Sequence, residues 1–504
     1  MKKQERFTRG AGVLLPVFSL PSQHGIGCFD EKAYEFIDFL QNAGQTYWQI
    51  LPLTPVGYGN SPYQSSCAFA GNLCFINLKE IATTDELSLL PFGNEKHVDY
   101  SAVYKSKMSV LKKCIKRILS IEKNEYHTDY TEFCKSNTFW LNDFAFYMSI
   151  KEKEENAAWY EWKNVGLRDR NERAMVEFYL DNSENIEFWK YTQFLFYTQW
   201  KKIKKYANDR GISIIGDVPI YVSHDSSDVW ANRALFVLDE KGHPTEVAGV
   251  PPDIFSSHGQ LWGNPIYNWD THEEKNFDWW KKRIEASSTL FDVIRIDHFI
   301  GIVNYYAIPA TESTAKNGKW YEGPAEKLIN VFSDIKNVKI IAEDLGNLTT
   351  EVEELMKKAG YPGMKILQFA FAGGYENPHL PHNFSENCVV YGGTHDNQTL
   401  VGYFSSCDKK EIEFVSEYLK TDKKSPTDIS KEIIKVGLSS AADIAVFTIQ
   451  DYLGLDDSAR INVPSTSQGN WQWRINEACL ADNLSSEIYS LCKLYNRINS
   501  DIKK

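Results

Sequence analysis

The sequence predicts an α/β fold built as a (β/α)8 barrel, and three observations support this prediction. Eight short, nearly continuous apolar runs end in polar or glycine-rich residues, which is typical of strands buried on both faces of a parallel sheet. Helical periodicity fills several intervals between the runs, and such alternation indicates a parallel sheet. Eight strands favour a closed barrel over an open sheet. The predicted strands lie at 13–20, 47–53, 212–222, 293–296, 338–342, 364–370, 388–392 and 444–450.

Two of the intervening helices have recognisable ends. Asp30 is expected to cap a helix that follows the first strand and ends at Gly44. A later helix is expected to begin with a capping box formed by Thr350 and Glu353 and to stop at Gly360.

Two intervals are too long for ordinary crossovers between strands. Residues 57–211, between the second and third strands, are predicted to form a mostly helical inserted subdomain, whose dense aromatic rings at 156–200 pack its core. The barrel is then formed by residues 1–56 and 212–504. Between the third and fourth strands, residues 245–270 are predicted to form a long lid loop over the active site.

Composition limits the classes of function. The chain has 504 residues and a net charge of −12, so a broad phosphate-binding surface for nucleic acid is not expected. It contains no apolar run of about 18 residues, so neither a membrane span nor a membrane partner is expected. Nine scattered cysteines lack any zinc-binding spacing and suggest a reducing compartment, which predicts a cytoplasmic protein. The 14 Trp, 27 Tyr and 28 Phe are a feature that the function has to explain.

Acidic side chains recur where the predicted strands end. Asp217 closes ISIIGD, Asp297 closes VIRID, Glu343 closes KIIAE, and Asp396 follows VVYGGTH. The carboxyl ends of barrel strands share one mouth, so these four acids are expected to converge. Each acid taken alone is as often a helix cap or a loop ion-pair partner, but four in successive units favour a functional site. Three further acids are expected to be loop residues, namely Asp253, Asp292 and Asp344.

Clustered carboxylates without phosphate loops or zinc spacing suit the cleavage of a glycosidic bond. One carboxylate attacks the anomeric carbon, while a carboxylic acid protonates the leaving oxygen. Crowding in a dry pocket raises the pKa of that acid, so that it keeps its proton near neutral pH. Arg295 lies two residues before Asp297, so both side chains point to the same face of the strand and the arginine can keep Asp297 ionised.

Long motifs extend this interpretation over nearly the whole chain. Four of them look like motifs of the retaining α-glucan barrels: RIDHFIG (295–301), IIAEDLG (340–346), GTHDN (393–397) and GDVPIYV (216–222). Three longer ones are more specific: RGAGVLLPVFSLPSQHGIG (9–27), YWQILPLTPVGYGNSPYQSSCAFAGN (47–72) and GVPPDIFSSHGQLWGNPIYNW (249–269). Together they resemble the amylomaltase, or 4-alpha-glucanotransferase (disproportionating enzyme), family. The resemblance runs from about residue 9 to QGNWQWRI at 468–475.

The resemblance implies a role for each matching residue. Asp297 would be the nucleophile that forms a glucosyl-enzyme, Glu343 the general acid and then base, and Asp396 a transition-state stabiliser. Further matching positions would bind and orient the sugar at the cleavage point: Asp217, Arg295, His298, His395 and the stacking residue Tyr63. Trp262 would belong to a segment, 249–264, that closes over the acceptor subsites, and Tyr58 would mark a second glucan site.

The implied activity is a 4-alpha-glucanotransferase that moves α-1,4-glucan segments by a retaining double displacement in maltooligosaccharide, starch or glycogen metabolism. Maltooligosaccharides and α-1,4-glucans would be donors and acceptors, glucose would be an acceptor, and no cofactor or metal is expected. Three alternatives remain open: a retaining α-glucan hydrolase of the same barrel type, a non-catalytic glucan-binding scaffold and a metal-dependent barrel hydrolase. The sequence departs from the family pattern at Gln398, where an acid is usual, and in NVPSTSQGNW (462–471), which has serines where a Pro-Gly-Thr run is expected.

Overall fold

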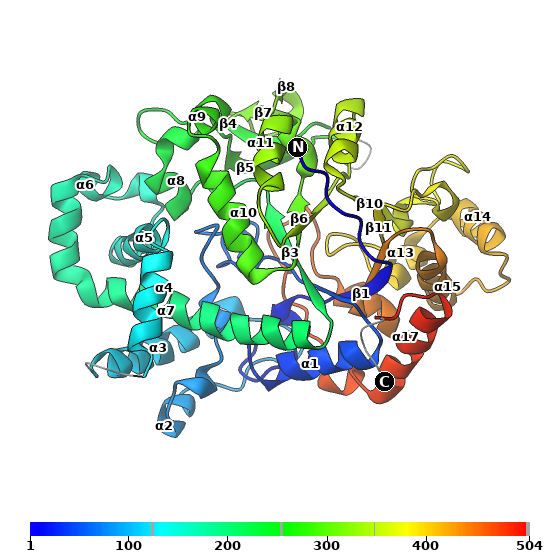
Figure 1. Cartoon of the computed structure of the whole chain (residues 1–504), viewed down its shortest axis with the longest axis horizontal. Helices are drawn as coiled ribbons and strands as arrows, with labels where there is room; N and C mark the ends of the chain where they lie inside the picture. Colours follow the sequence, from blue (N-terminus) through cyan, green and yellow to red (C-terminus); the bar gives the residue numbers. More distant parts are fainter. Residues whose placement is uncertain (122–124, 253–255, 347, 500–504) are drawn as a thin grey trace.

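The barrel is a sheet of eight parallel strands surrounded by helices (Figure 1). The computed structural model describes residues 1–121, 125–252, 256–346 and 348–499. The strands follow the order β10-β11-β12-β1-β2-β3-β6-β9, and each overlaps one predicted apolar run, so the barrel prediction is confirmed. The strands are β1 (Gly10–Leu14), β2 (Tyr47–Gln49), β3 (Ser213–Pro219), β6 (Val293–Asp297), β9 (Lys339–Ala342), β10 (Gly363–Ile366), β11 (Cys388–Tyr391) and β12 (Ile444–Thr448).

The barrel closes between β9 and β10, which are the two ends of this sheet. The Ala342 amide donates a 3.0 Å hydrogen bond to the Pro362 carbonyl across the seam. Side chains from many strands fill the interior with an apolar cluster, which includes Leu14, Ile215, Ile341, Met364 and Val446. A larger core lies between the strands and the outer helices, so both faces of each strand are buried and the runs read as continuously apolar.

The predicted ends of the first helix are confirmed. Helix α1 (Glu31–Asn42) begins after Asp30, whose side chain accepts a 3.0 Å hydrogen bond from the Lys32 amide. Gly44 follows the helix with φ +70°, a conformation that glycine adopts without steric cost.

The later capping box is a wrong prediction, although the helix exists. Helix α12 (Thr350–Ala359) is preceded by Thr349 in an extended conformation, so Thr350 is already helical and forms no box with Glu353. Gly360 ends the helix in the left-handed conformation, as predicted.

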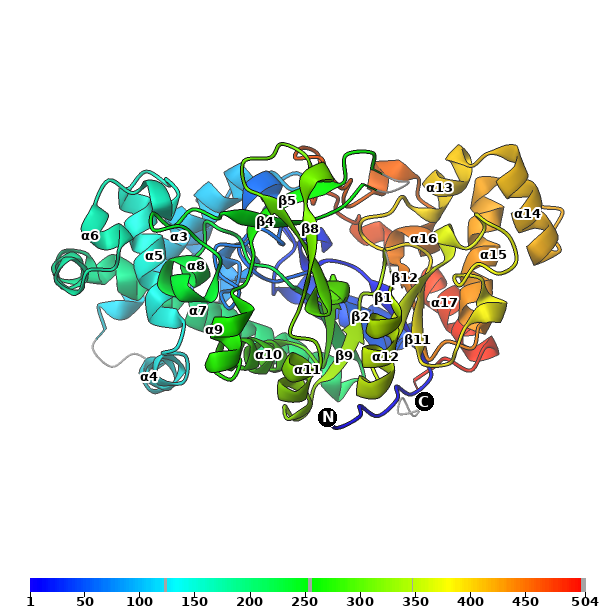
Figure 2. The same ribbon diagram turned by 90° about the horizontal axis from the view of Figure 1, so that it is seen from above.

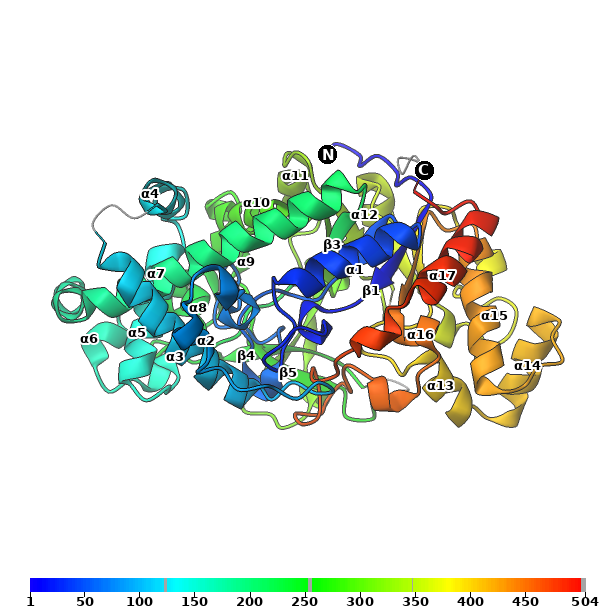
Figure 3. The ribbon, with the colours of Figure 1, turned by 90° about the horizontal axis from the view of Figure 1, so that it is seen from below.

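The long interval after β2 forms a helical flank on one side of the barrel (Figure 1). Its 38-residue helix α7 is interrupted at Asn182 (φ −132°) and then runs back to the barrel, where it contacts α1 and β3 (Figure 3). Rings of α7 such as Trp189, Phe196 and Trp200 are buried. Trp189 packs within the insertion, as predicted, whereas Phe196 and Trp200 contact Phe29 and so pack against the barrel. The helices of this interval are α2 (Thr84–Leu87), α3 (Tyr100–Leu119), α4 (His127–Ser136), α5 (Leu141–Lys153), α6 (Val165–Arg168) and α7 (Glu172–Asp209).

The segment predicted as a lid loop contains two strands of a second, antiparallel sheet, whose order is β5-β4-β7-β8 (Figure 2). β4 (Glu246–Val250) and β5 (Gln260–Pro265) come from the lid segment, whereas β7 (Asn304–Pro309) and β8 (Lys319–Glu322) follow β6. The strands form because this segment pairs with a distant hairpin that local sequence does not reveal. Asp253 lies outside the described residues.

The remaining helices complete the barrel and a flank opposite the insertion, where α13, α14 and α15 lie (Figure 2). No helix in the described part of the chain is long and apolar enough to cross a membrane. These helices are α8 (Ser227–Ala231), α9 (Trp269–Glu274), α10 (Asp278–Leu290), α11 (Glu326–Ser333), α13 (Leu400–Ser406), α14 (Lys409–Leu419), α15 (Pro426–Ser439), α16 (Ile449–Leu453) and α17 (Asp482–Leu494).

Candidate active site

The four predicted acids lie at the carboxyl ends of barrel strands. Asp217 belongs to the end of β3, Asp297 is the last residue of β6, Glu343 follows β9, and Asp396 lies in the loop after β11. The parallel pairing of β3 with β6 places Asp217 directly beside Arg295. Arg295 bonds both Asp217 and Asp297, and the His298 amide next to Asp297 bonds Glu343. Nε2 of His395 lies 3.4 Å from Asp396, so the predicted convergence is observed.

Arg295 joins two of the acids at the centre of the site. Its Nη1 lies 2.7 Å from both carboxylate oxygens of Asp217 and 3.0 Å from Oδ1 of Asp297. The side chains of Arg295 and Asp217 are almost fully buried, whereas 27% of the Asp297 side chain is exposed. Asp297 is therefore the member of this group that a bound substrate can reach.

Glu343 is another acid of the site and has a different, buried environment. Its Oε2 accepts a 2.6 Å hydrogen bond from the His298 amide, and its Oε1 accepts a 2.8 Å bond from the Leu345 amide. Burial raises the pKa of Glu343 to about 7, although Arg295 and the two amide donors oppose this rise.

Asp297 and Glu343 form a pair of acids that differ in their access to positive charge. Burial raises the pKa of Asp297 above its usual range, neighbouring carboxylates add to the rise, and the Arg295 guanidinium opposes it. Two such acids resist simultaneous ionisation, so the pair holds one proton over a range of pH. The charge is more stable on Asp297, because that carboxylate touches Arg295, and the proton is more stable on Glu343.

Tyr63 and His395 form a second polar group beside Asp217. The Tyr63 hydroxyl donates a 2.7 Å bond to Asp217 and lies 2.9 Å from Nε2 of His395. Since that hydroxyl has one hydrogen, Nε2 must be the donor in the second bond. Burial lowers the pKa of His395, so the neutral ring leaves Nδ1 as an acceptor. This buried nitrogen has no hydrogen-bond partner among the described residues and is free for a ligand hydroxyl.

His298 and Trp262 form another pair of rings in the site. The two rings meet edge to face with centroids 4.8 Å apart. His298 has a left-handed backbone (φ +52°), and burial lowers its pKa to about 4, so its ring is neutral. Its buried Nε2 has no hydrogen-bond partner within the described residues. Trp262 comes from β5, so the antiparallel sheet contributes directly to the site.

Sequence reasoning missed the residues that hold Asp396. Nδ2 of Asn462 donates a 2.6 Å bond to Oδ1 of Asp396, and the Asn462 amide donates to the His395 carbonyl. Arg460 also donates a 2.8 Å bond to the Asp396 carbonyl. The NVPSTSQGNW segment that contains Asn462 was the available signal, because it is a motif of polar residues without a helical or strand pattern.

Three predicted residues lie outside this group. Tyr58 is 81% exposed on the surface, so its predicted place at a second glucan site stays a prediction. Asp344 accepts a bond from the Met364 amide, and Asp292 accepts one from the Ile214 amide, so both have the structural role expected of loop acids. Among the residues that the structure describes, no group of three or more His, Cys, Asp or Glu could hold a metal ion.

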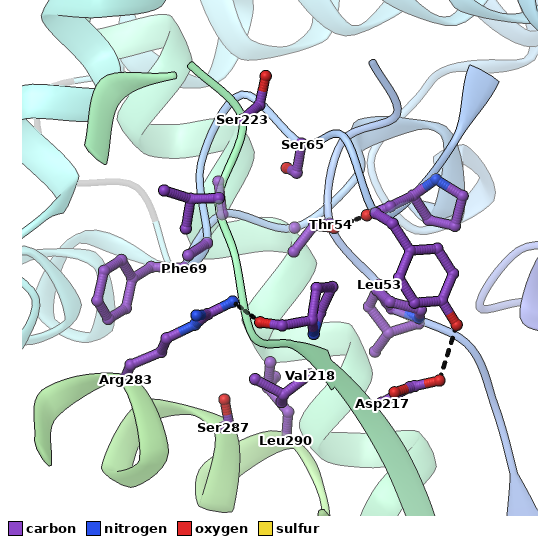
Figure 4. Close-up of a pocket in the computed structure, with 18 of the residues that line it drawn as sticks. Leu53, Thr54, Ser65, Phe69, Asp217, Val218, Ser223, Arg283, Ser287 and Leu290 are labelled. Carbon is purple, nitrogen blue, oxygen red and sulfur yellow. Dashed lines mark hydrogen bonds between the residues drawn. The ribbon is translucent and has the colours of Figure 1, made fainter. Parts of the chain in front are cut away.

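A pocket lies behind the Asp217 side of the site (Figure 4). Tyr63 and Asp217 line it together with residues of the β3 end and of α10. Arg283 of α10 lies on the side opposite Asp217 and donates hydrogen bonds to the Pro219 and Ile220 carbonyls. These bonds fix the chain directly after Asp217, so the buried arginine supports the strand end that carries this acid.

Comparison with known proteins decides the family. A family model described as 4-alpha-glucanotransferase matches residues 15–480. The chain belongs to this family. It is 44% identical over 492 residues to a 4-alpha-glucanotransferase of Clostridium butyricum, covering 95% of this chain and 99% of that protein. A 4-alpha-glucanotransferase of Thermus thermophilus is 40% identical over 97% of this chain and 99% of that protein.

The fold of this 4-alpha-glucanotransferase matches that of a solved relative over nearly the whole of this chain. The amylomaltase from Streptococcus agalactiae in complex with acarbose superposes with a TM-score of 0.93 at 38% identity, covering 97% of this chain and 100% of that chain. The chain is therefore an enzyme with 4-alpha-glucanotransferase activity, and its substrates are α-glucans. This finding selects the transferase among the alternatives that the sequence left open.

Proposed function

We propose that the enzyme transfers α-1,4-glucan segments by a retaining double displacement in which Asp297 is the nucleophile and Glu343 the general acid and base. The asymmetry of this acid pair is the observation that supports the proposal. Asp297 touches the Arg295 guanidinium, which favours the carboxylate, and Glu343 lies in a buried environment that keeps its proton up to a pH of about 7.

In the first step an Asp297 carboxylate oxygen attacks C1 of the donor sugar. The bond from C1 to the glycosidic oxygen breaks, and the Glu343 carboxyl gives its proton to that oxygen. The shortened glucan leaves with a free hydroxyl, and the remaining segment stays bound as an ester on Asp297.

In the second step the Glu343 carboxylate removes the proton from the 4-hydroxyl of an acceptor. That oxygen attacks C1, the ester bond breaks, and Asp297 regains its negative charge. Two inversions at C1 restore the original anomeric configuration. The Arg295 guanidinium stabilises the Asp297 carboxylate before and after each cycle.

We assign sugar contacts to the uncommitted polar atoms of the site. Nδ1 of His395 and Nε2 of His298 are buried without partners and suit ring hydroxyls. Asp396, which Asn462 holds in place, would bind hydroxyls of the distorted sugar, while Tyr63 offers a ring for stacking. The Trp262 ring would close over an acceptor, which is a maltooligosaccharide or glucose, and exclude water.

The setting that we propose is the cytoplasm, with substrates from maltooligosaccharide, starch or glycogen metabolism. All nine cysteines are free, which supports a reducing compartment.

Incubation with maltotriose tests the proposed transfer. We expect a ladder of glucans longer than maltotriose together with glucose and maltose, whereas a hydrolase yields shorter products alone. The Asp297→Asn variant should lower kcat by at least about 10⁴-fold and still bind maltooligosaccharides, because it keeps the shape of the site without the nucleophile.

Asp292→Asn is the matched control for this experiment. Asp292 precedes the same strand at the opposite end of the barrel, where it bonds the Ile214 amide. This variant should retain kcat within about threefold even if it is less stable. Substantial turnover by Asp297→Asn would reject the assigned nucleophile.

A further inference from the structure

We propose that Trp471 is a positioning residue, which holds the rings of Tyr63 and His395 in the orientation that binds the sugar. We further infer that the helical flank stabilises Trp471 in that position through Tyr100. The inference rests on the proposed function, in which Tyr63 and His395 contact the sugar at the cleavage point.

The ring of Trp471 completes a three-ring cluster with the two sugar-binding residues. Its centroid lies 5.6 Å from that of Tyr63 and 5.8 Å from that of His395, and the latter two rings stack 5.4 Å apart with an interplanar angle of 17°. Trp471 is 4% exposed, so it packs behind the cluster and leaves the substrate side to Tyr63 and His395.

The orientation of the Tyr63 ring has a direct chemical consequence. Its hydroxyl must reach Asp217 at 2.7 Å and His395 at 2.9 Å at the same time. A ring that tilts into space left by Trp471 would lengthen both bonds. Asp217 would then lose one of the donors that balance its charge beside Arg295, and Nε2 of His395 would lose its acceptor.

The backbone of Trp471 is strained in a way that needs support. Its φ is +63°, in the left-handed region that costs a bulky L-residue about 1–2 kcal/mol. Two hydrogen bonds fix this conformation: the Trp471 amide donates to the Ile461 carbonyl at 2.7 Å, and the Trp471 carbonyl accepts from the Tyr100 hydroxyl at 2.9 Å. Strain of this kind persists where surrounding contacts impose it, and it occurs most often at functional sites.

Tyr100 connects this conformation to the helical flank. It is the first residue of α3, is 6% exposed and lies 371 positions before Trp471 in the chain. The segments around these two residues are also paired. The Val98 amide donates to the Gln472 carbonyl, and the Arg474 amide donates to the Lys96 carbonyl. The start of α3 therefore determines where the Trp471 carbonyl lies.

The loop 461–471, which the Trp471 amide closes, also positions Asp396. Residue 461, whose carbonyl binds the Trp471 amide, is followed by Asn462, whose side chain holds Asp396. Asn470 closes the loop from within, because its Oδ1 accepts from the Val463 amide. A change at Trp471 is thus transmitted to Tyr63 and His395 through ring packing and to Asp396 through the loop.

Two substitutions at position 471 test the role of the ring, with rates expressed per folded enzyme as determined by circular dichroism. Trp471→Leu should lower kcat for maltotriose disproportionation about tenfold or more and change KM less than about threefold, because the lost orientation matters most at the distorted sugar. Trp471→Phe keeps a flat ring and should restore most of kcat. Trp473→Phe is the matched control, because Trp473 is buried two residues away and its carbonyl accepts from Ser19.

A double-mutant cycle with Tyr63→Phe separates positioning from general destabilisation. If Trp471 acts through Tyr63, the double variant Trp471→Leu/Tyr63→Phe should lose much less than the product of the two single losses. Independent multiplication of the two losses would overturn the positioning role. If Tyr63→Phe alone has no effect, the bonds of the Tyr63 hydroxyl to Asp217 and His395 do not matter for turnover and the inference fails, while the proposed stacking of the ring on the sugar is unaffected. If Tyr63→Phe lowers kcat and Trp471→Leu does not, the positioning role alone is rejected.

Tyr100→Phe tests the support from the flank and applies even if Trp471→Leu does not fold. It removes one buried hydroxyl and keeps the ring, so we expect a folded enzyme whose kcat is about three- to tenfold lower. The loss should disappear in a Trp471→Gly background, because glycine adopts a positive φ without support and has no ring to position. An unchanged kcat in Tyr100→Phe, or an equal loss in the glycine background, would contradict the proposed coupling.

Discussion

One guanidinium gives two chemically similar carboxyl groups different environments. Arg295 touches Asp297, which thereby becomes the better anion, while Glu343 is left with amide donors and a pKa near 7. The sequence predicted this difference from the two-residue spacing of Arg295 and Asp297 on one strand. It could not predict that Arg295 also binds both oxygens of Asp217, because that pairing depends on the register of two strands.

The pKa of Glu343 predicts the alkaline limb of activity. Glu343 must carry its proton to act as the general acid, and that form is lost as the pH rises through about 7. We therefore expect kcat/KM for maltotriose to fall about tenfold per pH unit well above that value. Initial rates between pH 5 and 9 measure this dependence, and a rate that stays constant to pH 9 would show that another group is the acid.

Ser465 occupies a glycine-like conformation, which predicts a stabilising substitution. Its φ is +64° at an exposed position of the NVPSTSQGNW loop, where serines replace an expected Pro-Gly-Thr run. Ser465→Gly should raise the free energy of unfolding by about 0.5 kcal/mol, since glycine removes the backbone strain. Thermal midpoints at one scan rate measure the change. Ser467→Gly, at an exposed position of the same loop without a positive φ, should lower the midpoint instead.

At the scale of elements, the barrel strands were predictable and the second sheet was not. Each barrel strand is buried on both faces and therefore appears as a continuous apolar run. In the second sheet, β4 pairs with β7 of a hairpin that lies after β6, and β5 is added on the other edge of β4, so their structure depends on a partner about 60 residues away. For the same reason the sequence located Asp396 but not Asn462, which lies 66 residues further along the chain.

The two faces of β5 predict an effect on transfer for one residue and none for its neighbour. Trp262 points toward His298, whereas the neighbouring Leu261 is 40% exposed and faces the other side of the strand. Trp262→Ala should admit water to the glucosyl-enzyme and raise the ratio of hydrolysis to transfer by about five- to tenfold. Released reducing ends compared with the maltotriose ladder give this ratio. Leu261→Ala should leave it unchanged, and an equal effect of both variants would show that the sheet, not the ring, excludes water.

At the scale of the whole molecule, Arg497 connects the first and last strands of the barrel. The side chain of Arg497 is fully buried and donates to backbone carbonyls of Gly10, at the start of β1, and of Leu438, Ser440 and Ala442, near the start of β12. The first and last strands of the barrel are neighbours, so this one side chain bridges the beginning and the end of the fold.

Loss of this bridge should destabilise the entire barrel. Arg497→Met removes the bond to the Gly10 carbonyl and leaves Arg9 as the only arginine donor to the carbonyls of Leu438, Ser440 and Ala442. We therefore expect the free energy of unfolding to fall by about 2 kcal/mol or more. Denaturant titration followed by circular dichroism measures the loss. Lys493→Met, an exposed cation on the last turn of α17, should change stability by less than about 0.5 kcal/mol. Equal stability of the two variants would contradict the bridging role.

The seam between β9 and β10 lies next to Glu343, the proposed general acid. Glu343 directly follows Ala342, whose amide crosses this seam to Pro362. Small opening motions at the seam would rotate the acid away from its proton-transfer geometry long before the core is exposed to water. On warming, turnover should therefore be lost at a lower temperature than the circular dichroism signal of the helices. The activity would then report the opening of the barrel seam before the protein unfolds.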